Sequence, residues 1–211
     1  MDEIDEINET GSTSRSNIRT FTVIGQIEGH YMLGEGQKST KYEHIIPLLA
    51  DAEQDNDTKG LLFLINTMGG DVEAGLAIAE MISGMSKPTT SVVLGGGHSI
   101  GVPLAVAAKR SFIVPSATMT LHPVRLNGTV IGVPQTYNYL QRMQDRITGF
   151  IAAHSKINID ELRRLMMNTD ELANDVGTII DGNAAVSCGL IDEIGGVSDA
   201  VKYLRGTMTG E

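Results

Sequence analysis

Residues 90–109 restrict the fold more than any other segment, because they join a strand, a glycine turn and a helix within a short stretch. The apolar run 91–94 predicts a buried strand, and the small residues of 103–109 predict a helix. Ser99 lies between them after three glycines, so its hydroxyl is expected at a tight turn that faces the N–H groups of the helix N-terminus. The surrounding residues fit G-x-S-x-G, which makes Ser99 a candidate nucleophile. The alternative is a serine that caps a helix in an ordinary glycine turn.

The order of a strand followed by a helix recurs three times along the chain. Continuous apolar runs such as 61–65 predict strands buried on both faces, as in parallel sheets. The expected strands are 18–27, 61–65, 91–94, 111–114, 119–122 and 189–194, with a further extended run at 128–133. The expected helices are 40–53, 72–85, 103–109, 135–154, 159–167, 181–188 and 198–204. These units predict an α/β fold with a mainly parallel sheet covered by helices.

Polar side chains mark where several of these helices are expected to begin. Ser39 or Thr40 is the expected cap of the first helix, because a side-chain oxygen there can accept its unpaired N–H groups. Asn158 is expected to cap the helix that follows it. Asp181 or Asn183 is expected to open the short helix before the only cysteine.

Length and composition limit the classes to which the protein can belong. Its 211 residues, 41% of them hydrophobic, suffice for one domain, expected over 18–206, while residues 1–17 predict a disordered acidic tail. A net charge of −10 argues against a nucleic-acid partner, which would need concentrated Lys and Arg. The single cysteine, Cys188, excludes an internal disulfide and fits a reducing compartment. No signal peptide or membrane-spanning run is found, so we expect a cytoplasmic protein without an integral membrane segment.

A serine nucleophile needs a base, and the chain has five histidines that could supply it. His98 precedes Ser99 directly, so its side chain is expected to point away from that of the serine. His122 ends the extended run 119–122 and leaves a strand edge, which suits a general base. It follows the serine, whereas in α/β-hydrolases the histidine comes last in the chain. The remaining histidines lie in a loop or on predicted helices, and they are His30, His44 and His154.

A second pair of glycines, Gly69 and Gly70, also lies between a buried strand and a predicted helix. Glycine lets the backbone approach a ligand closely and frees N–H groups from strand pairing. One N–H group of this turn and the N–H group of Ile100 are therefore candidates for an oxyanion hole. A phosphate cradle is the alternative, but the chain lacks the Lys-Ser/Thr of a P-loop and the third glycine of a dinucleotide fingerprint.

In their order along the chain, these motifs resemble ClpP, the proteolytic subunit of the Clp protease, over residues 21–194. The motifs are Asn66-Thr67-Met68-Gly69-Gly70, Gly95 to Ser99, Leu121-His122-Pro123, Ala184-Ala185-Val186 and Gly189-Leu190-Ile191-Asp192. Gly95-Gly96-Gly97-His98 replaces the family's usual Gln-Ala-Ala, and the loop 28–38 is longer. These departures indicate a divergent, TepA-like branch, the translocation-enhancing protein type. The resemblance implies a ClpP/crotonase-like fold of repeated β-β-α units, with 135–154 as a helical handle.

The resemblance also implies a role for each site residue. Ser99 would be the nucleophile and His122 the general base and acid, while Gly70 and Ile100 would supply the oxyanion N–H groups. A gap-free alignment places Gly177 where the family has its catalytic aspartate. Asp175, two residues earlier, is the expected third residue after a local shift. The alternatives for that residue are Asp170, Glu171 and Asp181, or no acid at all.

The implied activity is that of a serine endopeptidase that cleaves unfolded or short peptides inside a homo-oligomeric ring. Two stacked rings and an ATPase unfoldase partner are options, and no cofactor or metal is implied. One alternative is a catalytically impaired ClpP-like scaffold protein. Gly177 suggests it, because this glycine stands where the family has its catalytic aspartate. The other is a crotonase-type acyl-CoA enzyme with the same paired oxyanion glycines, although it gives no reason for Ser99 and His122.

Overall fold

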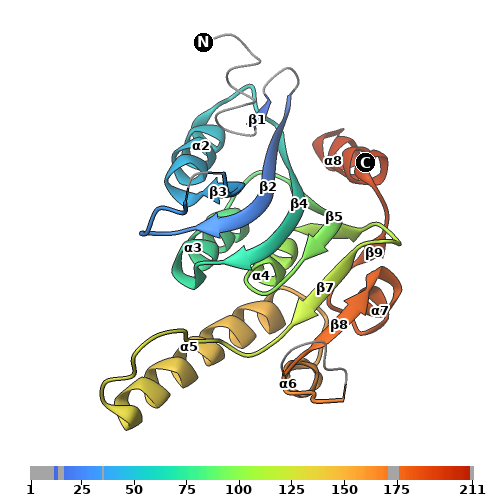
Figure 1. Cartoon of the computed structure of the whole chain (residues 1–211). Helices are drawn as coiled ribbons and strands as arrows, with labels where there is room; N and C mark the ends of the chain where they lie inside the picture. Colours follow the sequence, from blue (N-terminus) through green and yellow to red (C-terminus); the bar gives the residue numbers. More distant parts are fainter. Residues whose placement is uncertain (1–11, 14–16, 35, 171–175, 210–211) are drawn as a thin grey trace.

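The computed structural model describes residues 12–13, 17–34, 36–170 and 176–209. Its elements, labelled in Figure 1, are β1 (Ser12–Thr13), β2 (Ile18–Glu28), β3 (Ser39–Lys41), α2 (Tyr42–Gln54), β4 (Gly60–Gly70), α3 (Val72–Ser83), β5 (Thr89–Gly97), α4 (Gly101–Val106), β6 (Arg110–Ile113), β7 (Thr118–Leu121), α5 (Val133–Ala153), α6 (Ile159–Met166), β8 (Thr178–Asp181), α7 (Gly182–Ser187), β9 (Glu193–Ile194) and α8 (Val197–Thr209). The predicted α/β class is confirmed, since strands and helices alternate through the first half of the chain.

The main sheet has the strand order β1-β2-β4-β5-β6-β9, and its strands from β2 to β9 run parallel. The pair β7 and β8 is antiparallel and joins β5 through one bridge, between Gly96 and Thr118. This bridge brings the start of β7 to the end of β5, where the serine turn begins. The topology therefore places the residues after β5 beside the residues of β7.

Apolar side chains lie on both faces of the main sheet. Phe63 and Ile65 of β4 belong to a core cluster that α2, α3 and α4 cover, and Leu62 belongs to a second cluster under α8. Figure 1 shows α2 and α3 on one side of the sheet and α8 on the other. The continuous apolar run of β4 is thus explained by burial on both sides, as the sequence predicted.

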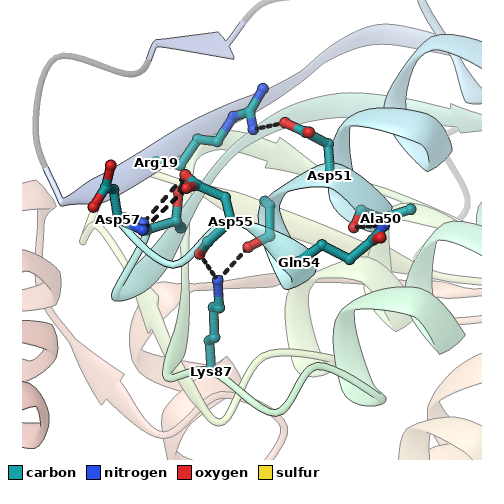
Figure 2. Close-up of polar contacts among 9 residues, drawn as sticks. Arg19, Ala50, Asp51, Gln54, Asp55, Asp57 and Lys87 are labelled. Atoms are coloured by element: carbon teal, nitrogen blue, oxygen red, sulfur yellow. Dashed lines mark hydrogen bonds and ion pairs between the residues drawn. The ribbon is translucent and has the colours of Figure 1, made fainter.

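Side chains from two other segments hold the C-terminal end of α2, as Figure 2 shows. Arg19 of β2 donates a hydrogen bond to Asp51 at 2.5 Å. The ammonium group of Lys87, which follows α3, donates to the carbonyl oxygens of Ala52, at 2.5 Å, and of Asp55. The last carbonyl groups of a helix lack partners within the helix, so a cation at this end stabilises it.

The start of α2 differs from the prediction that Ser39 or Thr40 caps it. Both residues belong to β3, and the hydroxyl of Thr40 bonds the backbone of Ile24 in β2. The hydroxyl of Ser39 donates to Glu28 at 2.6 Å. Both side chains thus tie β3 to β2, and Lys41 stands at the cap position without a side-chain hydrogen bond.

Several predicted boundaries also change. Ser12 and Thr13, within the predicted tail, pair with β2, so the expectation of an unstructured tail is not met for them, while residues 1–11 and 14–16 lie outside the described residues. The run 128–133 forms no strand, and β9 covers two residues of the strand expected over 189–194. Strand β8, which no pattern predicted, pairs with β7.

Helix α5 extends away from the sheet, as Figure 1 shows. Its C-terminal half buries Met143, Ile147 and Ile151, whereas Val133 and Tyr137 near its start are exposed. The helix therefore has the form expected of the handle. Among the helices of the described residues, none combines the length and hydropathy that a membrane span requires.

Candidate active site

Ser99 lies in the turn between β5 and α4 and has φ of 57°, the left-handed region. Among the described residues it is the only non-glycine with a positive φ. Such a conformation costs about 1–3 kcal/mol and persists where the surroundings hold it. Here the Ser99 N–H donates to Thr120 O at 3.0 Å, and its carbonyl accepts from Val102 N at 3.0 Å. The strained turn thus places the serine between β7 and the start of α4.

Gly69 makes room for the serine. A Cβ added to Gly69 would lie 2.7 Å from Ser99 Cβ, and the φ of +96° at this position disfavours any side chain. The hydroxyl of Thr67 accepts the N–H of Gly69 at 3.1 Å and donates to Gly25 O at 2.6 Å, which fixes the backbone here. The paired glycines of the sequence are therefore needed because β4 and the serine turn touch.

Gly70 lines the same cavity as Ser99. The N–H of the next residue, Asp71, donates to Ile27 O of β2 at 3.0 Å. Gly69 and Gly70 have φ of 96° and 153°, conformations that glycine adopts freely, and Gly69 lies against Ser99. Ile100 stands at the cap of α4, where the first N–H groups have no partner within the helix. The oxyanion role of the N–H groups of Gly70 and Ile100 stays a prediction.

His122 follows the last residue of β7, and its Nδ1 lies 2.7 Å from Pro123 O. A carbonyl oxygen only accepts, so Nδ1 carries the proton in this contact. The lone pair of a neutral ring is then on Nε2, which is the arrangement that a general base requires. The backbone of the next residue thus sets the tautomer of His122.

Ser99, His122, Gly70 and Ile100 line one cavity of about 120 Å³. The structure therefore brings together four of the five residues predicted for the site. The apolar residues that line the rest of the cavity belong to α3, α4, α5, α6, the end of β7 and the segment after it, and they include Val72, Val102, Leu121, Val124, Ile147, Ile151 and Met166. A polar reactive edge beside an apolar wall is typical of a site that binds an apolar side chain next to the reacting bond.

Gly177 lies directly against the histidine. A Cβ added to Gly177 would lie 2.9 Å from His122 Cβ and 2.5 Å from Leu121 O, and φ is +140°. Its N–H donates to Asn168 O at 2.8 Å. The position that aligns with the family's aspartate is therefore close to His122 in space, but this backbone leaves no room there for a side chain.

The other acidic candidates are placed as follows. Asp175 and Glu171 lie outside the described residues. Asp170 is exposed. Asp181 caps α7, where its side chain accepts from Ala184 N at 2.8 Å. The role of Asp175 therefore stays a prediction, and the carboxylate of Asp181 is engaged elsewhere.

Sequence reasoning gave no role to His98, although the structure places it close to the site. Its Nδ1 is 2.9 Å from the hydroxyl of Thr120, which lines the cavity. Burial lowers the pKa of His98, and a positive charge on His122 lowers that pKa further. In the sequence, Gly96 was the residue that could have indicated this placement. A Cβ on Gly96 would lie 2.6 Å from His98 Nε2, so the imidazole needs a glycine there.

The amino-acid sequence is similar to one protein family and to several known proteins. The family model described as Clp protease matches residues 14–198. The translocation-enhancing protein TepA of Halalkalibacterium halodurans is 55% identical over 206 residues, which cover 95% of this chain and 80% of that protein. The ATP-dependent Clp protease proteolytic subunit 1 of Chlamydia trachomatis is 37% identical over 82 residues, or 38% of this chain and 43% of that subunit. A putative protease of Methanocaldococcus jannaschii is 26% identical over 220 residues, covering 87% and 68% of the two chains.

The family match extends from just before β2 to the start of the last helix, α8. It confirms the predicted ClpP/crotonase-like fold, and the high identity to TepA confirms the predicted branch. The chain belongs to the Clp protease family, in its TepA-like branch.

Proposed function

We propose that this protein is a serine endopeptidase of the ClpP type that cleaves unfolded or short peptides. The observation that carries the proposal is the position of Ser99, which is held at φ 57° in a cavity that it shares with His122. A strained serine between a strand and a helix, with a histidine and two N–H donors around it, is the arrangement that acyl transfer requires.

The first half of the reaction would form an acyl-enzyme. Ser99 Oγ attacks the peptide carbonyl carbon while Nε2 of His122 takes the hydroxyl proton. The carbonyl oxygen becomes an oxyanion, which the N–H groups of Gly70 and Ile100 stabilise. The imidazolium then gives its proton to the leaving amine, the C–N bond breaks, and the ester of Ser99 remains.

The second half would release the acid product. A water gives its proton to Nε2 of His122 and attacks the ester carbon. The second oxyanion collapses, and Ser99 Oγ leaves with the proton from the histidine. Throughout, the hydrogen bond from Nδ1 to Pro123 O keeps the ring in the tautomer that the next turnover needs.

The cavity beside Ser99 indicates which side chain the peptide would place there. Its volume is about 120 Å³, somewhat less than the ~150 Å³ of an apolar cavity that holds a benzene molecule. We therefore infer a preference for medium-sized apolar residues such as Leu or Met on the acyl side of the cleaved bond, and discrimination against Trp.

We further propose that the chain works as a homo-oligomeric ring in the cytoplasm. Support comes from its family, from the exposed Val133 and Tyr137 on the protruding part of α5, and from a single cysteine that cannot form an internal disulfide. Two rings stacked through α5 and an ATPase unfoldase partner are the corresponding expectations for its assembly. Enclosure in a ring would keep folded proteins away from the serine.

Labelling with a fluorophosphonate tests the proposal, because such a probe reacts with activated serines. The purified full chain should be labelled at Ser99, as mass spectrometry of the peptides would show. Ser99→Ala should abolish both labelling and peptide cleavage, whereas Ser86→Ala should change neither, since Ser86 is exposed and does not line the cavity. A folded oligomer that is not labelled, or cleavage that survives Ser99→Ala, would refute the proposal.

A second candidate function is that of a catalytically impaired ClpP-like scaffold. It is favoured by Gly177, where the backbone has no room for the aspartate that the family alignment expects. The same labelling experiment separates the two functions. A stable ring without labelling and without cleavage would establish the scaffold.

A further inference from the structure

The glycines before Ser99 provide room for two side chains. A Cβ on Gly95 would lie 2.6 Å from Asn66 Oδ1, and that oxygen accepts the N–H of Gly96 at 2.9 Å. A Cβ on Gly96 would lie 2.6 Å from His98 Nε2 and 2.7 Å from His98 Cδ2. The imidazole of His98 therefore lies over the backbone of Gly96, in space that any other residue would fill.

This placement turns the other nitrogen of His98 toward β7. Nδ1 is 2.9 Å from the hydroxyl of Thr120, and the carbonyl of Thr120 accepts the N–H of Ser99 at 3.0 Å. Two adjacent residues of the serine turn are thus bonded to one residue of β7. The backbone of His98 is also fixed, since its N–H donates to Thr67 O at 3.1 Å and its carbonyl accepts from Gly101 N at 2.8 Å.

Thr120 and His122 are two residues apart on an extended segment, so their side chains leave on the same face. Met119 and Leu121, on the opposite face, are buried in the core. A shift or rotation of β7 that moved Thr120 would therefore move His122 with it. The contact between His98 and Thr120 acts on the base through this strand.

We propose that His98 is a positioning residue, which ties β7 to the nucleophile turn through Thr120 and so holds His122 in register with Ser99. This proposal rests on the proposed peptidase function. His98 acts from the serine side of the site, whereas Gly177 lies against His122 from another segment.

Substitutions at both ends of the contact test the proposal. The measurements are the rate of fluorophosphonate labelling at Ser99, and kcat and KM on a peptide substrate. His98→Ala and Thr120→Val should each lower kcat and the labelling rate about tenfold, with KM changed less than about twofold, because one hydrogen bond is lost and the base is displaced. The double variant should be no worse than either single variant, since both remove the same contact.

Two variants of matched chemistry distinguish positioning from simple packing. His98→Asn places its amide where Nδ1 stands and should keep most of the activity. His98→Gln places the same amide near the Nε2 position, away from Thr120, and should behave like His98→Ala. Rescue by Gln and not by Asn would overturn the proposal.

The remaining outcomes are also decisive. Losses that multiply in the double variant, or a His98→Ala variant that is labelled at the rate of the natural chain, would overturn the role of His98 while leaving the peptidase intact. If His98→Ala does not fold, Thr120→Val and the Asn and Gln pair still decide the question. A natural chain that is not labelled at Ser99 would instead refute the proposed function, and the positioning role with it.

Discussion

The two halves of the candidate active site are held in different ways. On the serine side, three backbone N–H groups donate hydrogen bonds. They run from His98 N to Thr67 O, from Ser99 N to Thr120 O and from Gly101 N to His98 O. These bonds lie within the turn or reach strands that border it. The nucleophile therefore has a position that a short stretch of sequence and its two neighbouring strands determine.

The histidine side depends on segments that are far apart in the sequence. His122 follows the four-residue strand β7, and its ring bonds Pro123 O. Val124, which follows Pro123, donates its N–H to Gln144 Oε1 of α5 at 2.8 Å, and Gly177 lies against Cβ of His122 from a third segment. The base is thus placed by long-range contacts. Changes on the serine side should act through strain and clash, and changes on the histidine side through orientation.

Removing the base should have the largest effect. His122→Ala should lower kcat for peptide cleavage about 10³-fold, because general acid–base catalysis contributes about 10²–10⁴-fold. Labelling at Ser99 should fall in parallel, while the melting temperature stays within a few degrees. The matched control is His44→Ala, since His44 is an exposed residue of α2. A His122→Ala variant with near-normal cleavage would show that another group activates Ser99.

Gly69→Ala tests the serine side and should rank second. The added methyl group would lie 2.7 Å from Ser99 Cβ at a φ of +96°, so the serine must move. A displacement of about 1 Å can cost about 10²-fold in rate, which is the loss that we expect in kcat/KM. The control is Gly149→Ala within α5, where the methyl group meets nothing within 4 Å and should stabilise the helix by about 0.5–1 kcal/mol. Equal activities of the two variants would contradict the close contact at Gly69.

The orientation of the histidine can be tested at the acidic candidates. In a serine, histidine and aspartate triad, replacing the aspartate by asparagine costs about 10⁴-fold, largely through the wrong tautomer. Here the carbonyl of Pro123 already fixes the tautomer, so Asp175→Asn should cost only about tenfold in kcat. Asp181→Asn should cost nothing, because asparagine caps a helix as well as aspartate does. A loss above about 10³-fold for Asp175→Asn would show that this carboxylate, and not Pro123 O, orients the ring.

The contrast between local contacts at Ser99 and long-range contacts at His122 also explains what the sequence could predict. The turn at Ser99 was predicted because its apolar run, glycines and helix follow one another directly. The caps at Asn158 and Asp181 were predicted for the same local reason, and both are confirmed. The predicted cap at Thr40 was wrong because its hydroxyl finds a distant partner, Ile24 in the neighbouring strand.

Long-range pairing explains what the sequence left out. Strand β8 has only four residues and is held by its pairing with β7, so no periodicity marks it. Pro123 O, one partner of the His122 ring, is a backbone carbonyl, which every residue carries and which no motif can indicate. The contact of His98 with Thr120 joins the serine turn to β7, across 22 positions of the sequence. The nucleophile was therefore visible in the sequence, whereas the restraints on the base were not.

The smallest expected effect is on the pH dependence of stability, and it tests the protonation of His98 alone. Burial lowers the pKa of His98 in the folded protein, and the charge of His122 lowers it further. The unfolded chain binds this proton near pH 6.5, whereas the folded protein binds it only at lower pH. The free energy of unfolding should therefore decrease as the pH falls below about 6.5.

Carboxylates whose pKa is lowered in the folded protein act in another window. Hydrogen bonds from Arg146 and Arg164 lower the pKa values of Glu73 and Glu161 below the ordinary value of 4.5. Both carboxylates are therefore ionised in the folded and unfolded states between pH 8 and 5.5. Their contribution to the free energy of unfolding is constant in this range. Melting temperatures across this range should fall toward pH 5.5, and less steeply for His98→Asn than for the natural chain. Identical slopes would contradict the burial of a neutral His98 beside the site, because the removed imidazole would then have had no pKa difference between the two states.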